Sequence, residues 1–475
     1  MSREKNLLKN TAIITIGKIC TQLITFFLLP LYTSILSTAE YGTVDLLNTL
    51  VSLLLPIVTF QIEQAVFRSL IDNRENHTEQ VKTISTSIII VLIQSTIYLS
   101  IFFIIAPFVN NEYKYFLATN VIAYIFSSLL QQIARGLGKN TQYAMGSFIS
   151  AFSTIMFNII FLLVFKFGAK GMLIANMIGQ LICTLYIFLE LKIYKYINVK
   201  EFRKKVLTKL WKYSMPLIPN AISWWIFNAS DRVIVSTLLD LSSTGLLSAA
   251  NKFSSVYITF YNIFNMSWTE NIALHIKDAD IKEYFNKMFN IVLKIFVAMG
   301  IGMIACMPFV YPIMINEKFN EGYGLVPILI IASFFNVVVG LISVIYVAKK
   351  NTKAIANTSV VSAGINIIVH LALIKFIGLY AAAISTFVSF FIMSIYRIYD
   401  INRKYFKINI EKNILIMSFV VLSIVLVTYY LNNKYLCLIS LLITIIYAYL
   451  INKDSLQMLL KMLKEKVHKR NEEIL

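Results

Sequence analysis

The stretch TISTSIIIVLIQSTIYLSIFFIIA, residues 83–106, contains no charged side chain and is long enough to cross a bilayer as a helix. Only 14% of the 475 residues are charged, against about 25% in a typical soluble protein, so there are too few charges to cover a water-facing surface. The sequence therefore predicts an all-α, polytopic membrane protein with about 14 transmembrane helices. The apolar runs lie near residues 11–35, 43–66, 83–106, 115–134, 143–165, 171–190, 213–238, 245–268, 287–309, 323–347, 354–374, 378–399, 413–431 and 435–451.

The basic residues are distributed unevenly between the two sides of these expected spans. The net charge is +19, from 43 Lys and Arg against 24 Asp and Glu. With the N-terminus placed inside, 33 of the 43 basic residues fall in the N-terminus, the inner loops and the C-terminal tail. The positive-inside rule then predicts that both termini are cytoplasmic. Cations used in this way indicate contact with membrane lipids and no nucleic-acid partner.

The expected loops leave no room for a catalytic domain. The longest outer loop is near 310–322, and the longest inner one is near 191–212. The four cysteines and four histidines are scattered without metal-ligand spacing, and no phosphate-binding loop occurs. The sequence therefore favours a transporter over an enzyme, with no catalytic residues, no metal and no nucleotide cofactor.

An internal repeat divides the chain. The segment ILSTAEYGTVDLLNTL at 35–50 resembles LLDLSSTGLLSAANKF at 238–253, with Gly42 aligned to Gly245. Each copy holds six spans, so the repeat is parallel and predicts two pseudo-symmetric six-helix lobes, an arrangement used by transporters. The expected divisions are an N-lobe at 1–195, a basic cytoplasmic linker at 196–212, a C-lobe at 213–400, an extra helix pair at 401–451 and a basic amphipathic tail at 452–475.

Polar residues form stripes along several expected spans, at the spacing of one helix face. The striped spans are the first, second and fifth, and then the seventh, eighth and eleventh, so the stripes follow the repeat. Polar side chains within lipid normally face a protein interior or a wet cavity. Hydrogen bonding between neighbouring helices is the simpler reading of any single stripe.

Four basic residues fall inside the expected spans, namely Lys18, Arg232, Lys252 and Lys294. A central Lys or Arg costs about 2.5–3.5 kcal/mol, so each needs an acidic partner or an anionic ligand. From its depth, Asp231 is expected to pair with Lys252, which would leave Arg232 as the freer cation. Lys18 is expected to pair with Glu63, and Lys294 to reach the inner interface. Static ion pairs are the alternative to ligand binding.

Three segments carry a resemblance to a known family: residues 9–47, KNTAIITIGKICTQLITFFLLPLYTSILSTAEYGTVDLL; residues 216–235, PLIPNAISWWIFNASDRVIV; and residues 378–385, GLYAAAIS. They look like the polysaccharide flippase family, bacterial exporters of O-antigen and capsule repeat units within the multidrug/oligosaccharidyl-lipid/polysaccharide exporter superfamily. The resemblance covers about residues 1–400. It implies two six-helix lobes around a cationic cavity, in a bacterial cell membrane.

The same resemblance implies a function in surface polysaccharide biosynthesis. The expected substrate is an undecaprenyl-diphosphate-linked oligosaccharide, moved from the inner to the outer leaflet by alternating access of the two lobes. An H+ or Na+ gradient is the expected energy source, and a glycan polymerase and glycosyltransferases are candidate partners.

A cation in a low dielectric attracts such an anionic head strongly. Depth in the expected spans and position on the polar stripes select the candidate site residues, and Asp45 lies on the stripe of the second span. The expected substrate-binding residues are Lys18, Arg232, Lys252, Gln22, Asn228 and Asn262. The expected coupling or counter-ion residues are Asp45, Glu63 and Asp231. Two alternatives belong to the same superfamily: a lipid II flippase, and a cation-coupled multidrug exporter. Asp45 favours the exporter, whereas Lys18 in the first span opposes it.

Overall fold

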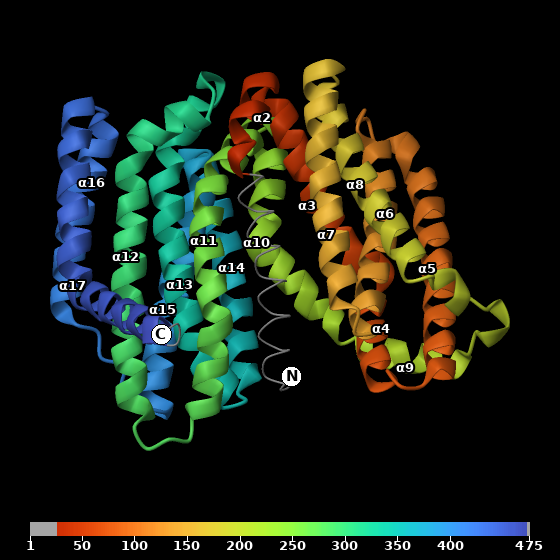
Figure 1. Cartoon of the computed structure of the whole chain (residues 1–475). Helices are drawn as coiled ribbons and strands as arrows, with labels where there is room; N and C mark the ends of the chain where they lie inside the picture. Colours follow the sequence, from red (N-terminus) through yellow and green to blue (C-terminus); the bar gives the residue numbers. More distant parts are fainter. Residues whose placement is uncertain (1–25, 473–475) are drawn as a thin grey trace. The chain divides into compact units, whose positions relative to one another are not determined.

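The computed structural model describes residues 26–472, and every regular element in that range is a helix (Figure 1). Within these residues, eleven helical segments are long and apolar enough to cross a bilayer, which confirms an all-α, polytopic membrane protein. They are Thr38–Thr59, His77–Phe108, Lys114–Gly136, Asn140–Val164, Gly168–Glu190, Ile281–Met314, Glu317–Ala348, Lys353–Ile377, Tyr380–Lys404, Lys412–Leu431 and Lys434–Lys453.

Three of the fourteen expected spans are not among these eleven. Helices α10 (Leu217–Leu238) and α11 (Leu241–His275) have 22 and 35 residues and are long enough to cross. They carry two of the four embedded cations of the sequence analysis, Arg232 on α10 and Lys252 on α11, and charged residues lower the mean hydropathy of a helix. The expected first span lies mostly outside the described residues, and its last part forms α2 (Leu29–Ile35). The total of fourteen and the cytoplasmic position of both termini therefore stay predictions.

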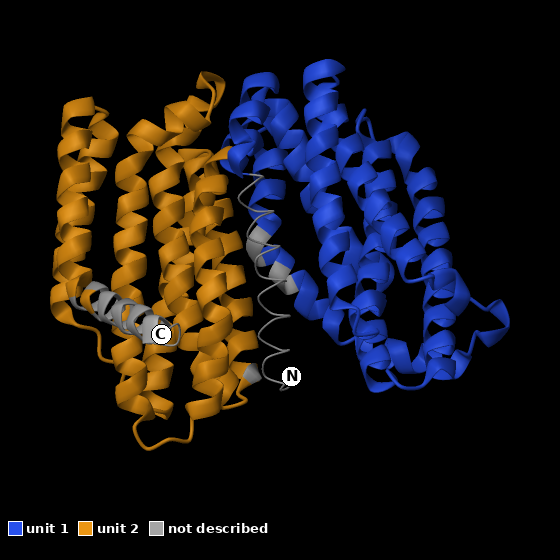
Figure 2. Cartoon of the chain, viewed as in Figure 1, with its two compact units in different colours: residues 1–248 blue, residues 249–475 orange. Residues whose placement is uncertain are grey.

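The chain forms two compact units, residues 1–248 and 249–475, which are described separately (Figure 2). In unit 1, aliphatic side chains such as Ile62, Leu129 and Ile187 form a buried core. The helices of unit 1 are α2, α3 (Thr38–Thr59), α4 (Ile62–Asp72), α5 (His77–Ile105), α6 (Lys114–Gly136), α7 (Asn140–Ile159), α8 (Gly168–Glu190), α9 (Lys204–Ser214), α10 and the first residues of α11. The expected lobe boundaries come from the sequence repeat rather than from packing, and they stay predictions.

The expected second span, 43–66, is divided into two helices. Ser37 caps the start of α3 by accepting a hydrogen bond from the Glu40 N–H, and the Glu40 carboxylate accepts one from the Ser37 N–H in return. At the other end, Phe60 and Gln61 both adopt left-handed backbone angles, with φ of 53° and 57°. Non-glycine residues rarely adopt such angles, and two in succession end α3 at Thr59 before α4 begins.

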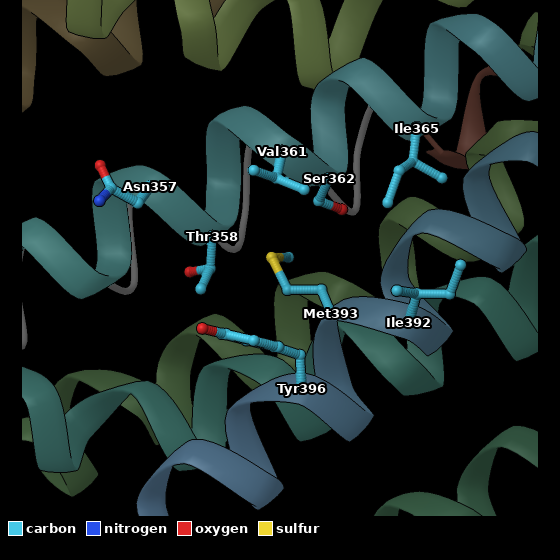
Figure 3. A pocket seen from close by; sticks show the side chains of 8 residues that line it. All are labelled: Asn357, Thr358, Val361, Ser362, Ile365, Ile392, Met393 and Tyr396. Atoms are coloured by element: carbon cyan, nitrogen blue, oxygen red, sulfur yellow. The ribbon is translucent and has the colours of Figure 1, made fainter.

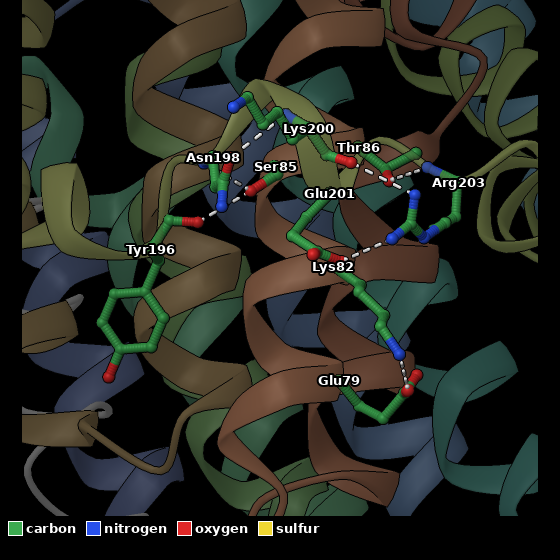
Figure 4. Close-up of polar contacts among 9 residues, drawn as sticks. All are labelled: Glu79, Lys82, Ser85, Thr86, Tyr196, Asn198, Lys200, Glu201 and Arg203. Atoms are coloured by element: carbon green, nitrogen blue, oxygen red, sulfur yellow. Dashed lines mark hydrogen bonds and ion pairs between the residues drawn. The ribbon is translucent and has the colours of Figure 1, made fainter.

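The expected basic linker is folded onto α5 of unit 1 (Figure 4). The Ser85 hydroxyl donates to the Tyr196 carbonyl at 2.8 Å and accepts from the Asn198 N–H at 2.9 Å. The Thr86 hydroxyl accepts from the Arg203 N–H at 3.3 Å. These contacts attach the chain between α8 and α9 to the N-terminal part of α5. The linker is therefore packed against unit 1.

The rest of the linker forms α9, an amphipathic helix. Its Leu207 and Leu210 are buried in the unit 1 core, while Lys205 and Lys209 are exposed. The hydrophobic face of α9 therefore holds the start of α10 close to the unit 1 core, because α10 begins three residues after α9 ends.

Unit 2 has its own core, in which aromatic side chains such as Trp268, Phe285 and Tyr346 pack together. The extra helix pair packs on α12, and α17 continues through Glu472 within the expected amphipathic tail. The helices of unit 2 are the remainder of α11, α12 (Ile281–Met314), α13 (Val326–Ala348), α14 (Thr352–Ile377), α15 (Tyr380–Lys404), α16 (Lys412–Leu431) and α17 (Lys434–Glu472).

Candidate functional site

A charged centre lies in unit 1 where α3, α10 and the start of α11 meet. Nε of Arg232 on α10 donates to Oδ2 of Asp45 on α3 at 2.6 Å. The Ser248 hydroxyl on α11 donates to the same carboxylate oxygen. The Arg232 and Asp45 side chains are 20% and 22% exposed, so the pair is neither fully buried nor freely solvated. Part of each side chain is therefore accessible, and charges interact more strongly at such a site than they do in bulk water.

Two glycines allow α3 and α11 to approach closely enough to build this centre. A Cβ added at Gly42 would lie 2.0 Å from the Leu241 carbonyl oxygen, and one at Gly245 would lie 2.0 Å from the Thr38 carbonyl oxygen. Neither position therefore accepts a side chain without movement of the backbone. These are the two glycines that the sequence repeat aligns, and the structure places them in contact with each other.

Other polar groups of α3 also join this helix to its neighbours. The Trp225 indole N–H of α10 donates to the Thr49 carbonyl at 2.9 Å. The Asn176 amide of α8 donates to the Asn48 side-chain oxygen at 3.2 Å. Asn48 therefore does what the simpler reading of the stripe predicts, because it hydrogen-bonds to a neighbouring helix. Asp45, on the same stripe, instead forms an ion pair with Arg232.

The structure changes the expected pairing of the embedded cations. Arg232 was expected to be the freer cation, but it forms an ion pair with Asp45. Asp231 lies in unit 1 and Lys252 in unit 2, so their expected pairing stays a prediction. Lys294 was expected to reach the interface, and its Nζ lies 2.9 Å from Oε2 of Glu411.

Several candidates are not brought to the charged centre. Lys18 and Gln22 lie outside the described residues, and so does the side chain of Asn228. Asn262 is an exposed residue of α11 in unit 2. Their proposed contact with a substrate stays a prediction, and the described centre consists of Asp45 and Arg232 with Ser248.

Glu63 is buried just beyond the break between α3 and α4. It is 3% exposed, and its Oε2 has no hydrogen-bond partner within residues 26–472. α4 is not one of the candidate spans, and burial raises the pKa of the Glu63 carboxyl above its ordinary value of 4.5. Its expected partner Lys18 is outside the described residues. A carboxyl in these surroundings favours the protonated form.

Arg397 on α15 is a buried cation that sequence reasoning missed. It lies at the inner end of the expected twelfth span, 378–399, where a basic residue is expected to face the cytoplasm, but it is only 2% exposed. Its guanidinium donates to hydroxyl groups of Thr358, Ser359 and Ser343. Because these hydroxyls come from α13 and α14, no local pattern around Arg397 could have revealed its burial.

Comparison with known proteins identifies the family of this chain. The family model described as "Polysaccharide biosynthesis protein" matches residues 7–269, which include both Asp45 and Arg232. This chain belongs to that family. Among curated proteins, none matches the sequence.

Solved structures share the fold of this family member at low sequence identity. The lipid II flippase MurJ, in an inward closed conformation, has a TM-score of 0.68 and 17% identity, with coverage of 94% of this chain and all of that one. A multidrug resistance MATE family transporter of the MOP superfamily, in an inward-facing conformation, has a TM-score of 0.65 and 12% identity. That match covers 82% of this chain and 98% of the transporter. These likenesses show that the chain has the same fold as these two proteins.

Proposed function

We propose that this chain is a flippase for a polyprenyl-diphosphate-linked oligosaccharide, which it moves from the inner to the outer leaflet of a bacterial cell membrane. The observation that carries the proposal is the Asp45–Arg232–Ser248 centre, which lies within the family match. A cation embedded among membrane helices requires an anionic partner. The diphosphate of a lipid-linked sugar is an anionic group that must itself cross the membrane.

Arg232 recognises the diphosphate in this proposal. A guanidinium forms two parallel hydrogen bonds with a phosphate, which makes Arg the better residue for this ligand than Lys. Arg232 Nε is bound to Asp45, and in this proposal a phosphate oxygen of the cargo takes the place of that carboxylate. Recognition is therefore an exchange of one anion for another, which avoids leaving the cation unpaired in the membrane.

The exchange also suggests how transport is coupled to an ion gradient. A carboxylate that loses its cationic partner in a low dielectric has a raised affinity for a proton. Asp45 is therefore the first candidate for the H+ carrier in this proposal. Glu63, buried and unpartnered at Oε2 within the described chain, is a second H+ carrier, while Na+ is the alternative coupling ion.

Alternating access requires the close contact of α3 with α11 to open and re-form. The contact lies at the end of α3 that charge distribution assigns to the outer side. We assign to Gly42 and Gly245 the role of closing the outer end of the path. Without side chains between them, the two helices pack backbone to backbone and leave no passage for a sugar.

A lipid II flippase is the second candidate, favoured by the fold shared with MurJ over 94% of this chain. Its cargo carries the same diphosphate, so Arg232 would act in the same way. A multidrug exporter for cations is disfavoured, because an embedded arginine repels a cationic drug. The glycan polymerase and glycosyltransferases stay expected partners.

The test is deletion of the gene followed by analysis of polyprenyl-linked lipids in each leaflet. We expect an oligosaccharide other than the lipid II pentapeptide disaccharide to accumulate in the inner leaflet, and the full chain to reverse the accumulation. Accumulation of lipid II would instead support the second candidate. Normal lipid-linked sugars together with new drug sensitivity would contradict both.

A further inference from the structure

Arg397 of unit 2 is a buried cation with uncharged hydrogen-bond partners. Its guanidinium donates to Thr358 Oγ1 from Nε at 3.0 Å and from Nη2 at 2.7 Å. Nη2 also donates to the Ser359 hydroxyl at 3.2 Å and to the Ile355 carbonyl at 3.4 Å. Nη1 donates to the Ser343 hydroxyl. The hydrogen bonds are satisfied, but none of these partners neutralises the positive charge.

Asp400, the carboxylate that follows Arg397 on α15, binds other partners. Oδ1 of Asp400 lies 2.7 Å from Nζ of Lys404, and Oδ2 accepts a hydrogen bond from the Tyr346 hydroxyl at 2.7 Å. Within the described residues, no acidic side chain forms an ion pair with Arg397. An uncompensated charge in a low dielectric attracts anions over a long range.

A cavity of about 230 Å³ lies beside this cluster, between α14 and α15 (Figure 3). It is much larger than the roughly 10–15 Å³ that one water molecule needs. Asn357, Thr358 and the Tyr396 hydroxyl lie at one end, whereas Ile365 and Ile392 lie at the other. Thr358 belongs to both the cavity and the Arg397 cluster, so the polar end is the end nearest the buried charge.

The surroundings of the cavity match a lipid more closely than a soluble ligand. Val360 and Ile395, on the two helices that form the cavity, are 56% and 51% exposed, as expected for surfaces in contact with hydrocarbon. At the polar end, Lys353 is exposed and lies one helical turn before Asn357, on the same face of α14. An apolar slot with a cationic mouth is complementary to an acyl chain with an anionic headgroup.

We propose that this cavity binds an acyl chain of an anionic phospholipid from the cytoplasmic leaflet, with the lipid phosphate at Lys353 and Asn357. The side of the membrane follows from the basic residues Lys349, Lys350 and Lys353 at this end of α14. Basic pockets between membrane helices on this side are suited to anionic headgroups. Arg397 strengthens the site through its charge and fixes the helices that form it, without touching the lipid.

The purified full chain in neutral detergent tests this site. Dioleoylphosphatidylglycerol is expected to raise the Tm in a saturable way, whereas dioleoylphosphatidylcholine, with the same acyl chains, is not. Val361→Trp fills the cavity from an exposed position and should abolish the response to phosphatidylglycerol. Val360→Trp is the matched control, because Val360 is a similarly exposed neighbour that does not line the cavity.

The charge at the mouth is tested separately. Lys353→Gln should raise the half-saturating concentration of phosphatidylglycerol about five-fold and leave the Tm without lipid unchanged. Equal responses to the two phospholipids, or a full response in Val361→Trp, would overturn the proposal. Stabilisation by undecaprenyl phosphate with no response to phosphatidylglycerol would also overturn it, because the slot would then belong to an isoprenoid tail.

Discussion

Two arginines among the membrane helices have opposite surroundings. Arg232 in unit 1 is 20% exposed and is bound to the Asp45 carboxylate, whereas Arg397 in unit 2 is 2% exposed and is bound to neutral oxygens. An anionic cargo can replace Asp45 at Arg232 because both are anions that accept the same hydrogen bonds. Arg397 instead joins α13, α14 and α15 and cannot reach a cargo. The difference leads to a testable expectation, namely that an embedded cation serves transport when it is accessible and its partner can be exchanged, as we propose for Arg232.

The largest expected effect is a loss of stability when Arg397 is replaced. Arg397→Leu removes the donor from several oxygens of two neighbouring helices, α13 and α14, and should lower the free energy of unfolding by about 3 kcal/mol or more. Chemical unfolding of the purified protein measures this change. Arg397→Lys should retain part of the stability, and a Leu variant as stable as the wild type would contradict the structural role.

The next effect concerns the backbone contact that builds the Arg232 centre. Gly245→Ala places a Cβ 2.0 Å from the Thr38 carbonyl oxygen, so the helices must separate, at a cost of about 1–3 kcal/mol. Gly302→Ala in α12 is the control, because a Cβ there meets no atom within 4 Å. Unfolding should show a loss for Gly245→Ala alone, and equal stability of the two variants would refute the close contact.

Neutralising the accessible cation should affect transport more than stability. Arg232→Gln is expected to reduce surface glycan at least about tenfold, while Arg232→Lys retains part of it through the charge. Lys294→Gln is the matched control, because Lys294 is also paired with a carboxylate, Glu411, 2.9 Å away. The measurement is surface glycan at equal protein abundance. Equal export by the Arg232→Gln and Lys294→Gln variants would contradict a special role of Arg232 in transport.

The smallest expected effect is a pH dependence of stability at Glu63. Burial raises its folded-state pKa above 4.5, so the folded chain holds this proton more tightly than the unfolded chain does. The stabilisation is complete below about pH 4.5 and is lost as pH rises through the folded-state pKa. The wild type should therefore lose more Tm than Glu63→Gln between about pH 5 and pH 8. Parallel curves for the two proteins would show that Glu63 does not titrate in this way.

Hydrophobic length predicted most of the fold, because an uncharged run such as residues 83–106 has few alternatives to a membrane helix. The repeat aligned Gly42 with Gly245 without predicting a contact between them, and the contact is evident only in three dimensions. The break at Phe60 and Gln61 could not be located from the sequence, because neither residue favours a left-handed backbone and the nearest helix-breaking residue, Pro56, lies inside α3.

The candidate site was predicted in part. The stripe on the second span selected Asp45, and the charge count selected Arg232. Their pairing was missed because the depth of a residue in its expected span gives its height along the membrane normal. It carries no information on which helices are neighbours. The same limit explains Arg397, whose partners lie about 40–50 residues away in the sequence, on other helices.

The central claim is that Arg232 binds the anionic cargo in addition to its ion-pair partner Asp45. The neutral double variant Asp45→Asn with Arg232→Gln tests this claim most directly. Both side chains keep their approximate size and can still hydrogen-bond to each other, so the double variant should fold with a Tm close to that of the wild type. Export of the lipid-linked oligosaccharide by this variant, measured at equal abundance, is expected to be lost. Export at the wild-type level would show that the two charges form a static pair, and would contradict the account.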